Sequence, residues 1–294
     1  MIAIDWGTTS LRATRLDAHG AVMGQRRSAQ GIRAAEGRFA EVLREEIKGW
    51  DDALVVMAGM VGSRQGWFEM PYVACPAGAA RIAQAMQRVP VQEFPDREIW
   101  LVPGLQTTHE GVPDVMRGEE AQLCGVLAQL PAQRTIVLLP GTHSKRAVIE
   151  GGRITGFATA MTGELFELLC AHSLLGKLMQ PGIFDAAAFA RGVAHAARAG
   201  DLLAHLFATR TLGLFGLLAP EQSHSFLSGL LIGHELDDLP ADAGTLHLVG
   251  APALLVAYEK ALALRGHGVR THDESASAQG LFLLAQQRGL LDGP

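Results

Sequence analysis

The chain begins with apolar segments whose spacing alternates between that of a strand and that of a helix. Ile2-Ala3-Ile4 is a short apolar run with β-branched ends, and Leu11 to Leu16 alternates apolar and polar residues, so both are expected to be strands. Apolar residues recur at helical spacing between Glu36 and Trp50, which predicts an amphipathic helix. Leu54 to Met57 then has the pattern of a buried strand. This order of elements predicts an α/β domain.

The same mixture of patterns continues to the C-terminus. Further helices are expected over 77–88, 114–130, 184–239 and 276–290, and further strands over 99–102, 135–139, 146–149, 154–158 and 245–249. The segment 104–113 is irregular and is interpreted as the crossing between two halves. Residues 1–112 are therefore assigned to an N-terminal domain. Residues 113–294 are assigned to a C-terminal domain, and packing of its final helix back on the first domain is left open.

A tight polar turn separates the first two expected strands. Asp5 ends the first strand, and Gly7-Thr8-Thr9-Ser10 follows it. Glycine lets backbone N–H groups approach a phosphate closely, the hydroxyls add donors, and a carboxylate is a hard oxygen ligand for Mg²⁺. The turn is therefore a candidate nucleotide site. An ordinary hairpin, in which Asp5 and Ser10 only satisfy the N–H groups of the turn, is an equally good explanation of these residues taken alone.

An internal repeat favours the nucleotide interpretation. A shift of 134 positions superimposes Gly7-Thr8-Thr9-Ser10 on Gly141-Thr142-His143-Ser144, and the preceding apolar run on Ile136-Val137-Leu138. Both copies run strand, glycine-bearing turn, strand, so two similarly built domains are expected. Asp5 falls opposite the uncharged Leu139. A carboxylate is therefore not a requirement of this hairpin, and Asp5 is expected to have a function of its own.

A loop rich in donors follows the expected strand that ends at Met57. Because ligand loops lie at the carboxyl ends of strands in open α/β sheets, this loop is expected at the mouth of a site. Its polar and aromatic residues suit a polyhydroxy carboxylate, and they are Ser63, Arg64, Gln65 and Trp67. Trp67 could equally fill a gap in the core. Arg64 could be a solvated surface residue, but its place between Ser and Gln after a strand favours a binding role.

Two further segments are weaker candidates. Asp114 stands at the start of an expected helix on the seam between the halves, where a substrate and ATP would meet, and Glu119 is five residues further on. An aspartate in that position is most often a helix cap. Gly250-Ala251 follows the last clear strand, and a turn of small residues there allows the backbone to approach the flat ring of an adenosine.

Composition and charge narrow the class of protein. The chain has 294 residues, of which 48% are hydrophobic and 19% charged, and its net charge is −5. An acidic protein without a basic stripe is not expected to bind nucleic acid or an anionic membrane. Its N-terminus lacks the features of a signal peptide, and no apolar run is long enough to span a bilayer. The odd and scattered cysteines, Cys75, Cys124 and Cys170, are typical of a cytoplasmic protein and give no signature of a cysteine metal site or a redox pair.

Five sequence blocks carry a resemblance to a known family. They are Ile4-Asp5-Trp6-Gly7-Thr8-Thr9-Ser10, Gly59-Met60-Val61-Gly62-Ser63-Arg64-Gln65-Gly66-Trp67, Met116-Arg117-Gly118-Glu119-Glu120, Pro140-Gly141-Thr142-His143-Ser144-Lys145 and Met161-Thr162-Gly163-Glu164-Leu165-Phe166. The duplicated units resemble the sugar kinase and actin-like ATPase fold. In this order, the five blocks more closely resemble the 2-dehydro-3-deoxygalactonokinase family. Members commonly carry Trp after the lysine, where this chain has Arg146, and that difference affects only local packing.

The resemblance implies a fold and a reaction. The fold would consist of two duplicated actin-like ATPase (ribonuclease H-like) domains, with an ATP cleft between them. The reaction would be the ATP-dependent phosphorylation of 2-dehydro-3-deoxy-D-galactonate at its terminal hydroxyl, which gives the 6-phosphate in galactonate breakdown. The residues by themselves predict only a Mg-ATP phosphotransferase that acts on a small polar substrate.

Roles for single residues follow from the two lines of reasoning together. Asp5 is expected to hold Mg²⁺ mostly through water, and Arg64 to bind the substrate carboxylate, with Ser63, Gln65 and Trp67 around it. Asp114 is assigned as the base, with Glu119 as its nearest competitor. The groups expected to bind the nucleotide are Gly7, Thr8, Thr9, Ser10, Gly141, Thr142, His143, Ser144, Lys145, Gly250 and Ala251. Lys145 could instead be a solvated strand residue.

Two other functions stay open at this stage. One is a different sugar or sugar-acid kinase of the same fold. The other is a non-enzymatic, nucleotide-driven switch such as an actin-like filament subunit or a chaperone ATPase, although such proteins are usually longer. The expected partners are a sugar acid and ATP. The sequence specifies no oligomeric state, and a homodimer remains open.

Overall fold

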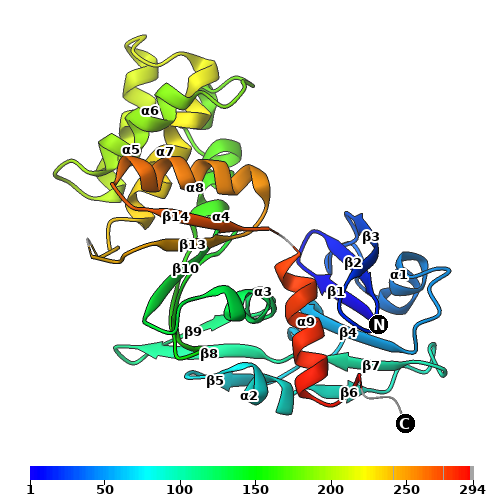
Figure 1. Ribbon diagram of the computed structural model, residues 1–294. Helices are drawn as coiled ribbons and strands as arrows, with labels where there is room; N and C mark the ends of the chain where they lie inside the picture. The colour runs from blue at the N-terminus through cyan, green and yellow to red at the C-terminus, as the bar shows by residue number, and fades with distance from the viewer. Residues whose placement is uncertain (241, 274, 292–294) are drawn as a thin grey trace. The chain divides into compact units, whose positions relative to one another are not determined.

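The computed structural model describes residues 1–240, 242–273 and 275–291 (Figure 1). They form two compact units. Unit 1 comprises Met1–Arg134, Ala147–Phe157 and the segment that begins at Asp273, and unit 2 comprises Thr135–Arg146 and Ala158–His272. None of the described helices is long and apolar enough to cross a bilayer.

The main sheet of unit 1 has six strands in the order β3-β2-β1-β4-β7-β6. They are β1 (Ile2–Trp6), β2 (Leu11–Leu16), β3 (Val22–Ser28), β4 (Leu54–Gly59), β6 (Gln87–Val89) and β7 (Glu98–Leu101). β1 is antiparallel to β2 and parallel to β4, and it lies in the interior of the sheet. Its apolar run is fully buried, as expected of a strand that is covered on both faces.

Four helices of unit 1 surround this sheet. They are α1 (Phe39–Glu46), α2 (Ala79–Gln84), α3 (Glu119–Val126) and α9 (Ala276–Gln287). The apolar side of α1 packs on the sheet through Val42 and Leu43, which join Ile2, Ile4 and Trp6 in one core. α9 packs on α2, α3, β1 and β4, so the last helix of the chain belongs to the same unit as the first strand.

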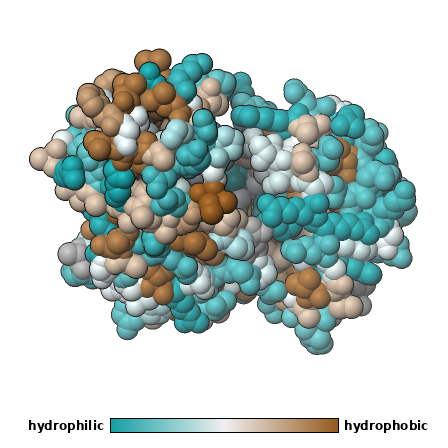
Figure 2. Space-filling model, turned by 90° about the horizontal axis from the view of Figure 1, so that it is seen from above, coloured by the Kyte–Doolittle hydropathy of each residue, from teal (hydrophilic) through white to brown (hydrophobic). Residues whose placement is uncertain are grey.

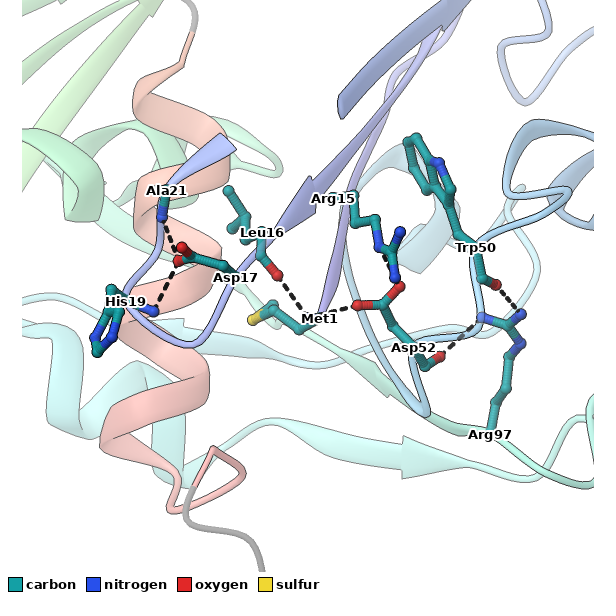
Figure 3. Close-up of polar contacts among 9 residues, drawn as sticks. All are labelled: Met1, Arg15, Leu16, Asp17, His19, Ala21, Trp50, Asp52 and Arg97. Atoms are coloured by element: carbon teal, nitrogen blue, oxygen red, sulfur yellow. Dashed lines mark hydrogen bonds and ion pairs between the residues drawn. The ribbon is translucent and has the colours of Figure 1, made fainter. Parts of the chain in front are cut away.

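Ionic contacts fix the start of β1 (Figure 3). The ammonium group of Met1 donates to the Leu16 carbonyl at 2.8 Å and to Asp52 Oδ1 at 3.1 Å, and Arg15 Nε lies 2.7 Å from Asp52 Oδ2. Burial acts to raise the pKa of Asp52, but the hydrogen bond and charge of the N-terminus, together with Arg15, outweigh it and lower that pKa. These contacts anchor one end of β1, and the other end carries Asp5 and the first glycine turn.

A small sheet in unit 1 corrects one prediction. It consists of β5 (Tyr72–Ala74), β8 (Gly104–His109) and β9 (Val112–Met116), in that order. The helix predicted from residue 114 is wrong in its start, because Asp114 lies in β9 opposite Thr107 and α3 begins only at Glu119. The tight hairpin at Glu110 and Gly111, which have φ of 50° and 85°, pairs this segment with β8.

Unit 2 repeats the architecture of unit 1. Its sheet has the order β12-β11-β10-β13-β14, which matches β3-β2-β1-β4-β7 strand for strand, so the predicted duplication is confirmed. The strands are β10 (Thr135–Leu139), β11 (Ser144–Glu150), β12 (Arg153–Ala160), β13 (Leu246–Val249) and β14 (Val269–His272). β14 was not predicted, because it is a short edge strand with exposed polar positions that lack a clear alternation.

Helices dominate the rest of unit 2, and three of them lie within the Ala- and Leu-rich range 184–239, where the helical prediction is confirmed. They are α4 (Thr162–His172), α5 (Ala186–Ala196), α6 (Leu202–Leu214), α7 (Ser223–Glu235) and α8 (Pro252–Leu264). Aspartates cap two of them: Asp185 Oδ1 accepts hydrogen bonds from two N–H groups of α5, and Asp201 accepts one from Ala204 at the start of α6. Two apolar clusters form the interior, one under α8 and one between α5, α6 and α7.

Candidate active site

The first glycine turn lies between β1 and β2 and has a defined shape. The N–H of Gly7 donates to the Ser10 carbonyl at 2.9 Å, which closes the turn, and the N–H of Ile32 donates to the Gly7 carbonyl at 3.0 Å. Asp5 precedes the turn and pairs in register with Arg12, whose Nη1 lies 3.8 Å from Asp5 Oδ2. The segment around Ile32 therefore holds the turn on one side. The hydroxyl residues Thr8, Thr9 and Ser10 remain at least partly accessible to a ligand.

Three segments of unit 1 meet at the carboxyl end of β1 and β4. Gly59 pairs with Trp6 in the parallel register, and a Cβ at Gly59 would lie 2.7 Å from the Trp6 carbonyl oxygen. A Cβ at Gly118 would lie 3.2 Å from the Cα of Gly59. Both glycines have positive φ, 97° and 113°, so both the contact and the backbone conformation require glycine. The first turn, the donor-rich loop and the start of α3 are thus brought together.

The donor-rich loop after β4 divides into a supporting part and an exposed part. Ser63 is buried and its hydroxyl donates to the Met60 carbonyl at 2.7 Å. The Trp67 ring stacks on Phe39 and meets Trp6 edge-on, so it packs against the core in the way the alternative interpretation described. Arg64 and Gln65 are exposed at the tip. Of the four residues predicted to bind substrate, these two are the most accessible.

Arg117 is a buried cation beside this loop that the sequence did not single out. Its Nη2 donates to the Met70 carbonyl at 2.7 Å, and its guanidinium lies 4.3 Å above the centroid of the Tyr72 ring. Nη1 also approaches the loop, since a Cβ at Gly62 would lie 3.1 Å from it. Within the part of the chain that the structure describes, Nε and Nη1 have no hydrogen-bond partner. Arg117 therefore places positive charge directly under the loop and holds it in shape.

Two glutamates begin α3, and they differ in environment. Glu119 is half-buried, and its Oε2 accepts the N–H of Arg117 at 3.0 Å. Glu120 is fully buried, and its Oε2 accepts the N–H of Gly118 at 2.7 Å. Burial, and then the charge of Glu119, raise the pKa of Glu120 to about 8. Glu120 is therefore neutral at pH 7, and Glu119 is the accessible carboxylate at the helix start.

Asp114 does not lie at the start of a helix, the position expected of it as the base. Its Oδ1 accepts the N–H of Val115 at 2.7 Å, within strand β9. The first turn of α3, where the partial positive charge of a helix N-terminus lies, begins at Glu119 instead. The reason is Gly118, whose positive φ ends the extended segment and starts the helix five residues later than predicted.

Glu120 gives a prediction about pH. Because its folded-state pKa lies above its ordinary value, the folded protein binds a proton that the unfolded chain has released, and stability falls as the pH rises from about 4.5 to about 8. Glu120→Gln keeps the shape of the neutral acid. In urea unfolding, the free energy of unfolding of the variant should exceed that of the wild type by an amount that grows as the pH rises across this range. Glu150→Gln, at an exposed position, is the control, and an equal gain there would contradict the assignment.

The second glycine turn lies between β10 and β11 in unit 2. The N–H of Gly141 donates to Ser144 Oγ at 3.4 Å, and the Thr142 carbonyl accepts the N–H of Glu164 at 3.0 Å. His143 Nε2 pairs with the Glu164 carboxylate at the start of α4. A Cβ at Gly163 would lie 2.5 Å from the Gly141 carbonyl oxygen, so α4 begins in direct contact with the turn. The turn is therefore held by α4, with Thr142 and His143 exposed.

Three other residues that were predicted to bind the nucleotide lie at or next to this turn. Lys145 is only 4% exposed, so the alternative of a solvated strand residue is wrong, and its Nζ donates to the His143 carbonyl at 3.1 Å. Gly250 follows β13, and a Cβ there would lie 3.5 Å from the Pro140 carbonyl oxygen, at the start of the turn. Ala251 then precedes α8, which has Pro252 in its first turn. The glycine segments predicted for phosphate and adenosine are neighbours in unit 2.

A buried network below the second turn was not foreseen from the sequence. The hydroxyl of Tyr258 on α8 donates to Glu235 Oε2 at 2.5 Å and lies 2.8 Å from Ser144 Oγ, and the Thr162 hydroxyl also donates to Glu235. Burial raises the pKa of Glu235 despite these hydrogen bonds. Glu235, Thr162 and Ser144 border a cavity of about 380 Å³ that Arg146 also lines. The network thus connects the turn with α4, α7 and α8.

The Tyr258 hydroxyl is expected to contribute measurably to stability. Tyr258→Phe removes the donor to Glu235 and leaves a buried carboxyl with fewer partners, which typically costs about 1–3 kcal/mol. Urea unfolding should show a loss of this size. The matched control is Tyr72→Phe, since Tyr72 is exposed and the variant keeps the ring under Arg117, so its effect should stay within about 0.5 kcal/mol. Equal losses in both variants would contradict this role of the network.

Comparisons with known proteins find relatives that match most of the chain. The family model described as 2-keto-3-deoxy-galactonokinase matches residues 5–284. The 2-dehydro-3-deoxygalactonokinase of Escherichia coli (strain K12) is 38% identical over 271 residues, 90% of each chain. The "Probable 2-dehydro-3-deoxygalactonokinase" of Rhizobium meliloti (strain 1021) is 37% identical over 296 residues, 97% of this chain and 96% of the relative.

Solved structures extend the comparison to the fold. A Sinorhizobium meliloti protein with the provisional name 2-dehydro-3-deoxygalactonokinase superposes with a TM-score of 0.90 at 35% identity, over 97% of this chain and 95% of that one. The activator of 2-hydroxyisocaproyl-CoA dehydratase from Clostridium difficile superposes with a TM-score of 0.54 at 12% identity, over 98% and 96%. The latter likeness concerns the fold alone, which is that of the actin-like ATPases and sugar kinases. The chain belongs to the 2-keto-3-deoxy-galactonokinase family.

Proposed function

We propose that the protein is an ATP-dependent kinase that phosphorylates 2-dehydro-3-deoxy-D-galactonate at its terminal hydroxyl and forms 2-dehydro-3-deoxy-6-phospho-D-galactonate. The observation that carries this proposal is the match to the family over residues 5–284, a range that contains both glycine turns, the donor-rich loop and the start of α3. The duplicated strand order and the glycine contacts at each turn support a nucleotide-dependent reaction.

The first turn supplies groups that suit Mg-ATP. Mg²⁺ in phosphotransferases is commonly held by one or two carboxylates together with phosphate oxygens and water. Asp5, at the end of β1 beside this turn, is the carboxylate that would hold such an ion together with phosphate and water. Bound Mg²⁺ would neutralise charge on the transferred phosphoryl group. Thr8, Thr9 and Ser10 would donate to phosphate oxygens from the turn.

The second turn would hold the remaining phosphates and the nucleoside. Gly141, Thr142 and His143 present backbone and side-chain donors, and Ser144 is fixed beneath them by Tyr258. Lys145 Nζ lies under the turn and adds positive charge there. Gly250 is buried next to the Pro140 carbonyl and is followed by the partly exposed Ala251, and residues this small would let an adenosine ring approach the backbone.

The sugar acid would bind at the loop after β4. Arg64 and Gln65 are exposed at its tip, while Arg117 stabilises the loop from below and adds to the positive potential. A planar guanidinium matches a carboxylate with two parallel hydrogen bonds, which an ammonium group does not. We therefore assign the substrate carboxylate to Arg64 and the substrate hydroxyls to Gln65 and neighbouring donors.

Arg64→Lys tests this assignment. The variant keeps the charge but loses the fork, so the KM for the sugar acid is expected to rise by at least about tenfold, while the KM for ATP changes by less than about twofold. Steady-state kinetics with each substrate varied in turn would measure both values. Arg88→Lys, which alters an exposed arginine paired with Glu98, should leave both KM values unchanged. If Arg64→Lys raises the KM values for the sugar acid and for ATP equally, Arg64 instead binds the nucleotide or maintains the structure of the loop.

A panel of acceptors separates the proposed reaction from its alternatives. The purified protein would be incubated with Mg-ATP and, in parallel, with aldonates, 2-keto-3-deoxy sugar acids and hexoses, and ADP release and phosphorylated products would be measured. We expect ADP release that depends on 2-dehydro-3-deoxy-D-galactonate. ADP release that is independent of any acceptor would indicate a nucleotide switch, and turnover only with a hexose or an aldonate would indicate another sugar kinase.

A further inference from the structure

Helix α6 in unit 2 carries apolar side chains on two opposite sides. On its inner side, Leu202, Leu206 and Leu212 pack on the apolar cluster between α5 and α7. On its outer side, Leu203, Phe207 and Leu214 follow one another at spacings of four and seven residues, which places them on one stripe of the helix. A helix that is apolar all round is normally buried all round. α6 is buried on one side only.

The distribution of polar residues on α6 is the reverse of that on an ordinary surface helix. His205 and Thr209 are buried, with 5% and 3% of their surface exposed, and His205 Nδ1 lies 3.0 Å from His234 Nε2. Leu203 on the outer stripe is 79% exposed. An isolated subunit would therefore bury polar groups of this helix and leave its large apolar groups in water, which is unfavourable.

The outer stripe continues into neighbouring residues and forms one apolar surface. Phe215 and Leu217 follow α6 directly, and Leu174 adjoins it because its carbonyl accepts a hydrogen bond from Arg210 Nη1 at 3.4 Å. We call this surface the α6 face, and it consists of Leu174, Leu203, Phe207, Leu214, Phe215 and Leu217. Figure 2 shows hydrophobic residues gathered over this helical part of the molecule, on the left of the view.

The area of the α6 face matches what a stable dimer needs. Its six residues are each between 57% and 79% exposed. With about 200 Å² for a fully exposed side chain of this size, these fractions correspond to roughly 800 Å² of apolar surface. That exceeds the roughly 300–600 Å² of the largest apolar patch on a typical monomer and equals the share of about 800 Å² that each partner contributes to a standard interface.

The charges around the α6 face favour a second copy of the chain over a membrane. Membrane-surface helices combine an apolar face with several Lys or Arg on the polar side. Arg210 is the single charged residue of α6; it falls on the outer stripe, three residues after Phe207, and donates to the Leu174 carbonyl at 3.4 Å. Arg191 likewise donates to the Leu217 carbonyl at 3.0 Å, so both of these arginines at the α6 face are bound to their own subunit. The net charge of −5 also opposes binding to anionic lipid. Two copies related by a twofold axis would place the same apolar stripe on both sides, as an isologous contact requires.

We propose that the protein is a homodimer whose two subunits associate through the α6 face, with the α6 helices packed against each other near Phe207. The contact would cover the outer stripe of each α6 helix. The proposal does not depend on which sugar acid the enzyme phosphorylates, since it rests on the exposure of the side chains of the α6 face, their apolar area and the charges beside them.

Sedimentation velocity and light scattering on the full chain test the proposal. The wild type is expected to show twice the monomer mass over a hundredfold range of concentration, without larger species, because an isologous contact closes on itself. The double substitution Leu203→Glu with Phe207→Glu should raise the dimer dissociation constant by at least about a hundredfold. Leu264→Glu, at an exposed position on α8 outside the α6 face, is the matched control and should remain dimeric.

Each result of these measurements either supports or overturns the homodimer. A wild type that stays monomeric overturns the proposal, and so does a folded double variant that stays dimeric. Circular dichroism and thermal unfolding of the variants show whether they fold; if the double variant does not, Phe207→Ser alone replaces it. Co-sedimentation with anionic phospholipid vesicles is the remaining measurement, and binding by a monomeric wild type would assign the α6 face to a lipid surface instead.

Discussion

Glu119→Gln is expected to reduce kcat by at least about a hundredfold and to leave the binding of ATP and of the sugar acid within a few-fold. The substrate hydroxyl must lose its proton as the phosphoryl group arrives, and a carboxylate in reach of that hydroxyl typically contributes about 10²- to 10⁴-fold. Glu119 begins α3, beside the close contact between Gly118 and Gly59 that brings the helix to the donor-rich loop after β4.

The experiment compares three variants of neighbouring acids. Asp114→Asn changes the residue that the sequence favoured, but because Asp114 lies in β9 and bonds its own strand, its kcat should stay within a few-fold of the wild type. Glu120→Gln alters the fully buried neighbour and should act on stability rather than on the chemical step. Calorimetry measures ligand binding, and single-turnover kinetics isolate the chemical step. An active Glu119→Gln with an inactive Asp114→Asn would return the role of base to Asp114.

Asp5→Asn is expected to lower turnover by at least about a hundredfold while the protein remains folded. The amide keeps the shape of the side chain and can still accept a hydrogen bond, but it loses the charge that holds Mg²⁺. The equivalent position in unit 2 is Leu139, which is buried at the end of β10, so the hairpin itself does not require an acid. The contact with Arg12, at 3.8 Å and partly exposed, contributes little to stability.

The dependence of rate on Mg²⁺ distinguishes a ligand from a structural residue. With Asp5→Asn, the Mg²⁺ concentration for half-maximal activity should rise together with the fall in turnover. Asp17→Asn is the control in the next turn, between β2 and β3, since Asp17 Oδ1 accepts the N–H groups of His19 and Ala21 at 2.8 and 2.9 Å (Figure 3). That variant should keep its Mg²⁺ dependence. If Asp5→Asn unfolds while Asp17→Asn remains folded, the role of Asp5 is purely structural.

The two variants probe different halves of one reaction. Glu119 would act on the sugar hydroxyl, and Asp5 on the metal that neutralises the phosphates. Both residues belong to unit 1, and the strand register of β1 and β4 connects them through Trp6 and Gly59. The cleft expected between the two halves of the chain stays a prediction.

The fold class and the position of the glycine turns follow from local patterns in the amino-acid sequence. Strands such as β1 and β4 are continuous apolar runs and helices such as α9 show helical spacing, and these signals lie within single segments of the chain. The repeat at 134 positions is enough to predict the duplication, because the same backbone turn needs the same small residues twice. The missing counterpart of Asp5 in that repeat is likewise visible in the sequence.

The side chains that surround those turns are set by tertiary contacts instead. The pairing of β8 with β9 places Asp114 in a strand and moves the helix start to Glu119, although local spacing favours an earlier helix. Arg117 gains its role by burial against Met70 and Tyr72, more than forty residues away. Tyr258 and Ser144 are 114 positions apart, and their contact depends on how α8 packs on the sheet. Burial and hydrogen-bond partners are properties of the folded chain, since residues distant in sequence supply them, and no local pattern contains them.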